Sequence, residues 1–354
     1  MSSHPLPREE LRAIAAYQAG RAAPEGAVKL SSNENPFPPL PGVEAAIADA
    51  ASAINRYPDF GSEQLTESLA QWLLVDSTQL TLGTGSVAVL SQVITAMAGR
   101  GDEVVFPWRS FEAYPILVQL SGASAVRVPL RHDHTHDLGA MTAAITERTR
   151  VVLVCTPNNP TGTTVKRADL ERFLDDVPPS VLVAVDEAYV EFVRDPASPD
   201  ALDLVETRPN VVVLRTFSKA YGLAGLRVGY GVGRTELMTE VRKAQLPFGV
   251  TALAERAALA ALAGRRELLR RVDALVVERS RVLEALAAMP YEVPDAQGNF
   301  VWLPLGESAE EFAGASERSG VVVRCFPGDG VRVTIGERGA NDRWLAVLHD
   351  FLGL

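Results

Sequence analysis

One lysine carries the most distinctive chemistry in this sequence. The apolar run Val211–Leu214 is typical of a buried strand, and Lys219 follows it in a turn of small and hydroxyl-bearing residues. The chain has only four lysines against 30 arginines, so a lysine at this place stands out. A lysine amine that loses its proton in an apolar pocket can attack a carbonyl and form a Schiff base, whereas arginine stays protonated. We therefore expect Lys219 to be a nucleophile. The alternative is a solvated charge beside a glycine turn.

An acid follows a second apolar run. Asp186 comes directly after Val183–Val185, and Tyr189 lies three residues further on. Open α/β sheets bind their ligands at the carboxyl ends of the strands, which is where this pattern puts both side chains. A buried carboxylate needs a cationic partner, which a bound ligand could supply. The alternative is an aspartate that caps a helix and a tyrosine that packs in the core.

Residues suited to an anion occur in two segments. The segment Gly83–Ser86 opens a predicted helix, whose first amides and dipole favour a phosphate group. The segment around Lys219 adds two hydroxyls and a guanidinium, which could hold the same group from other sides. The predicted anion-binding residues are Gly85, Ser86, Val87, Thr216, Ser218 and Arg227.

The run Ser218–Arg227, Ser-Lys-Ala-Tyr-Gly-Leu-Ala-Gly-Leu-Arg, resembles the cofactor-lysine motif of pyridoxal-phosphate aminotransferases of fold type I. It is most similar to the branch that contains histidinol-phosphate and aromatic-amino-acid aminotransferases, and the likeness extends from about Tyr17 to Arg332. The resemblance implies pyridoxal 5'-phosphate as the cofactor and transamination as the reaction. Lys219 would bind the cofactor and then act as general base, with a 2-oxo acid such as 2-oxoglutarate as acceptor.

The resemblance also assigns cofactor contacts to single residues. Asp186 would pair with the pyridine nitrogen and keep the ring an electron sink. Tyr189 would hydrogen-bond the phenolic oxygen of the ring, together with Asn159 of the Asn-Asn-Pro-Thr-Gly motif. Phe111 would stack on the ring face, with core packing as the alternative. Tyr57 would reach the cofactor of a neighbouring subunit, which implies a homodimer with shared active sites.

On the substrate side, the resemblance makes Arg332 the clamp for the anionic group of the substrate. A charge on an edge strand is the alternative. The segment 29–36 fits the N-terminal lid strand of the family but departs from it at Pro38, where glycine is usual. Further residues expected to line the substrate pocket are Arg324, Tyr17, Asn33 and Phe248, the last of them from the partner subunit.

Two further departures and one likeness bear on the substrate. The chain has Gly85-Ser86-Val87-Ala88 where histidinol-phosphate enzymes commonly show Gly-Ser-Asp-Glu, and Gly249 stands where they usually have asparagine. The segment Pro107–Pro115 instead resembles the aromatic-amino-acid (phenylalanine) enzymes. We therefore expect an aromatic amino donor, phenylalanine or tyrosine. Histidinol-phosphate aminotransferase is the first alternative, and a pyridoxal-phosphate lyase or a non-catalytic pyridoxal-binding regulator is more remote.

Apolar runs alternate with helical stretches through the middle of the chain, which predicts an α/β domain with a mostly parallel sheet covered on both faces. Its expected strands are 103–107, 125–129, 150–155, 181–185, 211–214 and 227–232. After Leu246 the chain changes to long helices, and strands return at 299–303, 321–324 and 331–334. The resemblance implies the same three-layer large domain with a smaller α+β domain. We expect an N-terminal arm over 1–29, a large domain over 30–245 and a small domain over 246–354.

Composition narrows the class of protein. With 47% hydrophobic residues the chain can bury a sizeable core, and its charge of −10 argues against nucleic acid or an anionic membrane as partner. No apolar run is long enough for a bilayer span, and the N-terminal residues Met1–Pro5 lack a basic and then apolar signal region, so we expect a cytoplasmic protein. Three histidines alternate in Arg131–Asp137, and we interpret this segment as a solvated loop without a metal.

Overall fold

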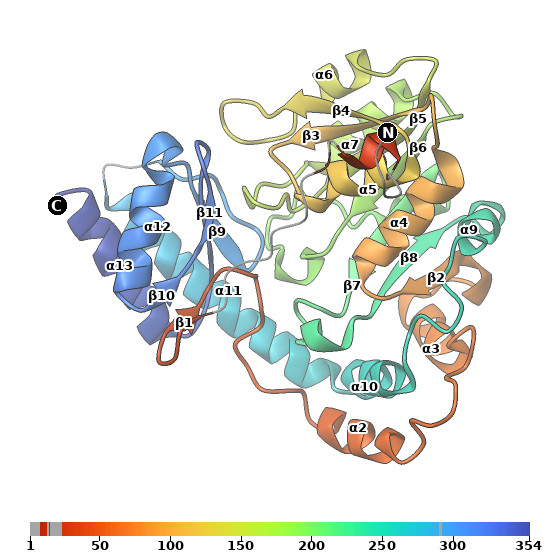
Figure 1. Cartoon of the computed structure of the whole chain (residues 1–354), viewed down its shortest axis with the longest axis horizontal. Coiled ribbons are helices and arrows are strands. Elements are labelled where there is room, and N and C mark those ends of the chain that lie inside the picture. The colour runs from red at the N-terminus through yellow and green to blue at the C-terminus, as the bar shows by residue number, and fades with distance from the viewer. Residues whose placement is uncertain (1–7, 13, 15–22, 290–291) are drawn as a thin grey trace, which may run out of the picture.

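The computed structural model describes residues 8–12, 14, 23–289 and 292–354. Within them the largest element is a seven-stranded sheet of order β2-β8-β7-β6-β5-β3-β4 (Figure 1). All neighbouring strands are parallel except for the two pairs that include β8. The expected mostly parallel sheet is therefore confirmed. Its strands are β2 (Leu80–Gly83), β3 (Glu103–Trp108), β4 (Ser124–Pro129), β5 (Thr149–Cys155), β6 (Leu182–Asp186), β7 (Val211–Thr216) and β8 (Gly229–Gly233).

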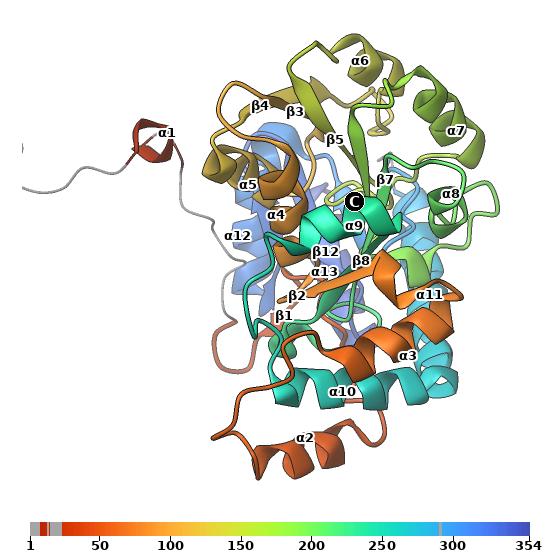
Figure 2. The ribbon, with the colours of Figure 1, turned by 90° about the vertical axis from the view of Figure 1, so that its right-hand side faces the viewer.

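Helices cover both faces of this sheet, as Figure 2 shows for α4 and α5 on one side and α7 and α8 on the other. In β5, Val151 and Leu153 pack into one core, and Val152 and Val154 into another. Successive side chains of a strand point to opposite faces, so a strand covered on both sides must be apolar throughout. This arrangement explains the valine-rich runs and confirms the three layers. One face carries α4 (Ser86–Met97), α5 (Ala113–Ser121) and α9 (Thr235–Arg242), and the other carries α6 (Leu138–Ala143), α7 (Arg167–Asp176) and α8 (Leu202–Val205).

Strand β8 runs opposite to its neighbours, which the sequence pattern did not reveal. Its first residue, Gly229, is paired with Thr216 at the end of β7 and with Gly83 at the end of β2. An antiparallel strand starts at the edge where its neighbours end. Arg227, two residues before β8, therefore lies at the edge of the sheet at which the chain leaves β7 toward Lys219.

A smaller group of elements follows residue 246. It contains a three-stranded antiparallel sheet of order β11-β12-β9, and β1 near the N-terminus pairs in parallel with β10 (Figure 1). Helix α10 lies in the expected small domain but packs on α2 (Val43–Ala51) and α3 (Glu63–Leu73), which lie in the expected large domain. The domain limits stay a prediction. The bounds are β1 (Val28–Lys29), α10 (Ala252–Ala263), α11 (Arg265–Ala287), β9 (Phe300–Leu303), α12 (Ala309–Arg318), β10 (Val321–Val322), β11 (Arg324–Phe326), β12 (Gly330–Thr334) and α13 (Arg338–Phe351).

Several elements were missing from the sequence prediction: α2 (Val43–Ala51), α3 (Glu63–Leu73), β2, α8, α9 and α12. Most of them are short, and short helices obtain their stability from tertiary packing rather than from local propensity. No helix in the described part of the chain is long and apolar enough to span a bilayer.

Gly229 lies very close to the start of α4, at the edge of the sheet where β7 ends. A Cβ at this residue would lie 2.1 Å from the backbone nitrogen of Ser86, the first residue of α4. We expect Gly229→Ala to lower the free energy of unfolding by about 1–3 kcal/mol, because the start of α4 must move away from the sheet. Denaturant unfolding followed by circular dichroism measures this loss.

Gly225→Ala is the matched control, since a Cβ at Gly225 would meet no atom of the described residues within 4 Å. It should change the free energy of unfolding by less than about 0.5 kcal/mol. Equal stability of the two variants would contradict the close contact between β8 and α4.

Candidate active site

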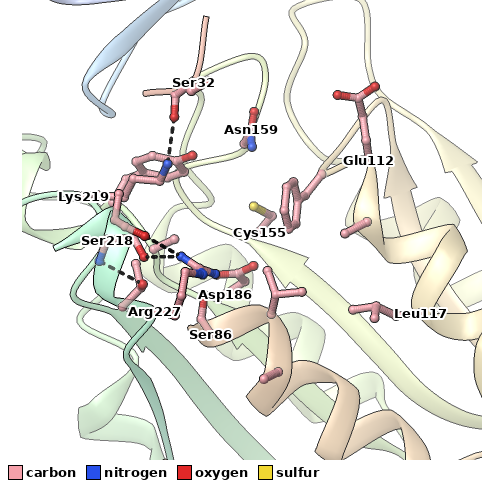
Figure 3. A pocket seen from close by; sticks show the side chains of 18 of the residues that line it. Ser32, Ser86, Glu112, Leu117, Cys155, Asn159, Asp186, Ser218, Lys219 and Arg227 are labelled. Atoms are coloured by element: carbon pink, nitrogen blue, oxygen red, sulfur yellow. Dashed lines mark hydrogen bonds between the residues drawn. The ribbon is translucent and has the colours of Figure 1, made fainter. Parts of the chain in front are cut away.

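A pocket of about 580 Å³ lies at the carboxyl edge of the large sheet, where it meets α4, α5 and the small sheet (Figure 3). Segments far apart in the sequence line it, from residues 31–32 to the strands β11 and β12. The residues that the sequence predicted and that line this one pocket are Ser86, Val87, Phe111, Asn159, Asp186, Tyr189, Thr216, Ser218, Lys219, Arg227, Arg324 and Arg332.

Lys219 projects into the pocket from the turn after β7. Its Nζ donates a hydrogen bond to the carbonyl oxygen of Ser32 at 3.0 Å, as Figure 3 shows. Burial lowers the pKa of Lys219 to about 7, and the positive charges of Arg332 and Arg227 act in the same direction, against Glu34. A large part of the Lys219 population is therefore neutral near pH 7, as a nucleophilic amine requires.

Asp186 ends β6 and is 7% exposed. The hydroxyl group of Tyr114 in α5, which is fully buried, donates a hydrogen bond to Oδ2 of Asp186 at 2.8 Å. Among the described residues, none forms a hydrogen bond with Oδ1 of Asp186, which is buried. Burial raises the pKa of Asp186 to about 6, against the hydrogen bond from Tyr114. A carboxylate with one oriented and one unsatisfied oxygen fits a ligand that brings a protonated ring nitrogen.

Sequence reasoning did not single out Tyr114. Its hydrogen bond to Asp186 depends on the contact between α5 and the sheet, which no local pattern reveals. The one available signal was its place three residues after Phe111, which puts both residues on one side of a helix start. The two rings pack edge to face, with centroids 5.6 Å apart.

The predicted anion-binding residues surround the start of α4. Arg227 donates from Nη1 to Oγ of Ser218 at 3.3 Å and from Nη2 to the carbonyl oxygen of Thr84 at 3.4 Å. Gly85 precedes the helix with a φ of 86°, and a Cβ there would lie 2.6 Å from Nη2 of Arg227. Glycine is thus needed for both the backbone angle and the close approach of the guanidinium. The first amides of α4, two hydroxyls and a guanidinium fit a phosphate group.

A hydrogen-bonded group closes the opposite side of the pocket. Asn33 donates from Nδ2 to the Tyr189 hydroxyl at 3.0 Å. Arg332 donates to Oδ1 of Asn159 and to the carbonyl oxygen of Ser31, the latter at 2.7 Å. This group connects β12 of the small sheet to two loops at the edge of the large sheet.

Helix α5 forms a third wall. Phe111, Ala113, Ile116 and Leu117 contribute apolar surface to the pocket, and Glu112 contributes a carboxylate. In Figure 3, Glu112 and Leu117 lie across the pocket from Lys219 and Ser218. This wall was anticipated only through Phe111.

Four predicted residues in the described part of the chain do not line the pocket. Gly85 and Asn33 contact residues that do line it. Tyr57 and Phe248 stack on each other with ring centroids 4.8 Å apart and are 83% and 40% exposed. They lie outside the pocket of their own chain. Tyr17 lies outside the described residues.

The interpretation of Arg131–Asp137 as a solvated loop is wrong for one residue. His132 is exposed, but His136 is only 6% exposed, and burial lowers the pKa of its imidazole to about 4. The next residue, Asp137, caps α6 by accepting from the Ala140 amide at 3.0 Å. In the described part of the chain, no group of three or more His, Cys, Asp or Glu side chains could hold a metal ion.

Comparison with known proteins now decides the family. Residues 25–348 match the family model described as aminotransferase class I and II. The chain belongs to this family. The expected enzyme class, an aminotransferase, and the expected cofactor, pyridoxal 5'-phosphate, are thereby confirmed.

Individual relatives agree with this assignment. The chain is 55% identical to an aromatic amino acid aminotransferase of Streptomyces coelicolor over 98% of both chains, and 53% identical to one of Thermobifida fusca over 98% of this chain and 97% of the other. Among solved structures, it resembles histidinol-phosphate aminotransferase of Sinorhizobium meliloti in complex with pyridoxal-5'-phosphate. That match has a TM-score of 0.88 and 26% identity and covers 99% of both chains.

The lowered pKa of Lys219 gives a testable pH dependence. Cofactor-free protein should capture pyridoxal 5'-phosphate at a rate that rises with pH around a midpoint of about 7 and then levels off, because only the neutral amine attacks the aldehyde. Stopped-flow absorbance over a pH series measures the midpoint. Arg332→Gln removes a positive charge that lowers this pKa, so its midpoint should be higher. A midpoint close to the ordinary lysine value in the unmodified protein would contradict the expectation.

Proposed function

We propose that this aminotransferase moves the amino group of an aromatic amino acid, phenylalanine or tyrosine, to a 2-oxo acid such as 2-oxoglutarate. The observation that carries the proposal is the pairing, in one pocket, of a lysine whose pKa is lowered to about 7 with a buried, half-satisfied carboxylate. An amine that is partly neutral near pH 7 serves both as nucleophile and as general base.

The residues around the pocket suit defined parts of the cofactor. Lys219 would bind it covalently, and Oδ1 of Asp186 would accept from its ring nitrogen. Asn159 and Tyr189 would contact its phenolic oxygen, and Phe111 its ring face. When bound, the cofactor supplies an electron sink for the bond that breaks at the substrate Cα. The phosphate would lie against Ser86, Val87, Thr216, Ser218 and Arg227, next to Gly85.

Other groups of the pocket would transfer the Cα proton and bind the substrate. Nζ of Lys219, when it is not bonded to the cofactor, would take the proton from Cα of the amino donor, and in the second half of the reaction it would give a proton to Cα of the oxo-acid acceptor. Tyr114 holds Asp186 in a fixed orientation by its hydrogen bond of 2.8 Å. Arg332 would bind the α-carboxylate in place of its present oxygen partners, with Asn33 supporting this wall through Tyr189.

Two observations support an aromatic donor. The relatives at 53–55% identity are named aromatic amino acid aminotransferases. The α5 wall offers apolar surface from Phe111, Ala113, Ile116 and Leu117, which suits an aromatic side chain.

We further propose that the protein works as a homodimer. Tyr57 and Phe248 form an exposed aromatic stack outside their own pocket, and Phe60 packs edge to face on Phe248 at 5.6 Å. Exposed aromatic clusters of this kind favour a protein interface. In the dimer, Tyr57 would contact the phosphate of the cofactor in the partner subunit, and Phe248 would contact the substrate there. Tyr17 would be a further substrate contact.

Histidinol phosphate is the second candidate donor. It is favoured by the likeness to histidinol-phosphate aminotransferase of Sinorhizobium meliloti and by the presence of a second arginine, Arg324, in the pocket. A lyase reaction is the more remote alternative. It would use the same cofactor chemistry but would consume no amino acceptor.

Lys219→Ala should lower kcat for phenylalanine with 2-oxoglutarate by at least about 10³-fold, because it removes both the covalent partner and the base. The variant should still unfold at the temperature of the parent and bind the aminated cofactor, measured by fluorescence titration. Lys243→Ala is the control, since Lys243 is exposed and pairs with Glu240 at the surface. Near-parental turnover of Lys219→Ala would refute the role of Lys219.

The choice of donor is tested by kcat/KM for phenylalanine, tyrosine and histidinol phosphate with 2-oxoglutarate as acceptor. We expect the aromatic amino acids to be preferred. A preference of tenfold or more for histidinol phosphate, about 1.4 kcal/mol, would overturn the donor assignment. A transaminase consumes one oxo acid for each donor, and conversion of the donor without that consumption would indicate a lyase.

A further inference from the structure

The pocket contains two arginines side by side on the small sheet. Arg324 of β11 and Arg332 of β12 are direct partners in the antiparallel register, and both line the pocket. Directly opposed residues of an antiparallel pair lie on the same face, with Cβ atoms about 4.5–5.5 Å apart. Two adjacent guanidinium groups match a dianion, such as a phosphate monoester, better than they match one carboxylate.

Glu112 changes this charge balance. Its carboxylate accepts from Nη2 of Arg324 at 2.9 and 2.7 Å and from Nε at 3.3 Å. The pair is sheltered, since the side chain of Arg324 is 13% exposed and that of Glu112 is 30% exposed. Glu112 itself lines the pocket, so its charge acts on whatever binds between the arginines.

We propose that Glu112 makes this site select a carboxylate rather than a phosphate as the anionic arm of the amino donor. Arg324, Arg332 and Glu112 together carry one net positive charge, which suits a carboxylate. A phosphate dianion placed against both arginines would meet the Glu112 carboxylate, and a like charge in a sheltered site is a means of rejecting the wrong ligand. The inference rests on the proposed aminotransferase function and adds to it the residue that decides between the two candidate donors.

The Glu112–Arg324 pair also ties the start of α5 to the small sheet, so a purely structural role must be separated from selectivity. A second ion pair makes the same connection: Arg109, just before α5, bonds Asp329 in the turn between β11 and β12. Asp329 does not line the pocket. Asp329→Asn is therefore the matched control for the loss of such a tie.

The test compares two donors that share an imidazole side chain and differ in the anionic arm: histidine, with a carboxylate, and histidinol phosphate. The reaction of each donor with the holoenzyme, without acceptor, is followed by the absorbance of the cofactor. Glu112→Gln should raise the efficiency ratio of histidinol phosphate to histidine by about tenfold or more. The change should appear in the apparent dissociation constant rather than in the limiting rate, because the charge acts on binding.

A second variant keeps the carboxylate and removes the cation. Arg324→Gln should lower the same ratio below the parental value, and adding it to Glu112→Gln should cancel the gain. Asp329→Asn should leave the ratio unchanged. An unchanged ratio in Glu112→Gln, or equal shifts in Glu112→Gln and Asp329→Asn, would overturn the role of Glu112.

Failure of this inference differs from failure of the proposed function. A parental holoenzyme that does not convert phenylalanine would refute the proposed function. Normal conversion of phenylalanine, together with a ratio that no Glu112 variant changes, would refute only the selectivity of Glu112.

Discussion

The register of the buried parallel strands is the constraint on which the rest of the structure depends. Cys155, Asp186 and Leu214 are direct partners across β5, β6 and β7. These strands are apolar on both faces, and a slip by one residue would exchange the side chains that face the two helical layers. The packing of the valines therefore fixes the positions of Asp186 and Thr216 at the carboxyl ends of their strands. The pocket lies at this common edge, so the packing of the core sets the positions of its polar groups.

The electrostatics of the pocket follow from that position. Burial raises the pKa of Asp186 and lowers that of Lys219, so in the protein alone both groups are less readily charged than in water. Such a site is arranged for a ligand that brings a positive ring nitrogen to the acid and a carbonyl group to the amine. An acidic chain, with a net charge of −10, would have to hold the phosphate of that ligand with local groups, for which we propose a helix start, two hydroxyls and Arg227.

The substrate side is built differently. Its groups come from the start of α5, from residues 31–33 and from the hairpin of β11 and β12, and each contact crosses between segments more than 150 residues apart in the sequence, as for Asn33 and Tyr189. Small changes in such contacts alter the charge presented to the substrate and leave the cofactor edge intact. This separation accounts for one fold serving different amino donors.

The sequence by itself determined the alternating α/β pattern, the proposed cofactor lysine Lys219 and the residues that follow each buried strand. These are local signals: an apolar run predicts a strand, and in a parallel sheet all strand ends meet at one edge. The tertiary structure alone decided the direction of β8, which brings Arg227 to that edge, and the contact of Tyr114 with Asp186. It also decided the pairing of Glu112 with Arg324 and the burial of His136. These features depend on which faces of distant elements meet, and hydrophobic periodicity records only that a face is buried, not which partner buries it.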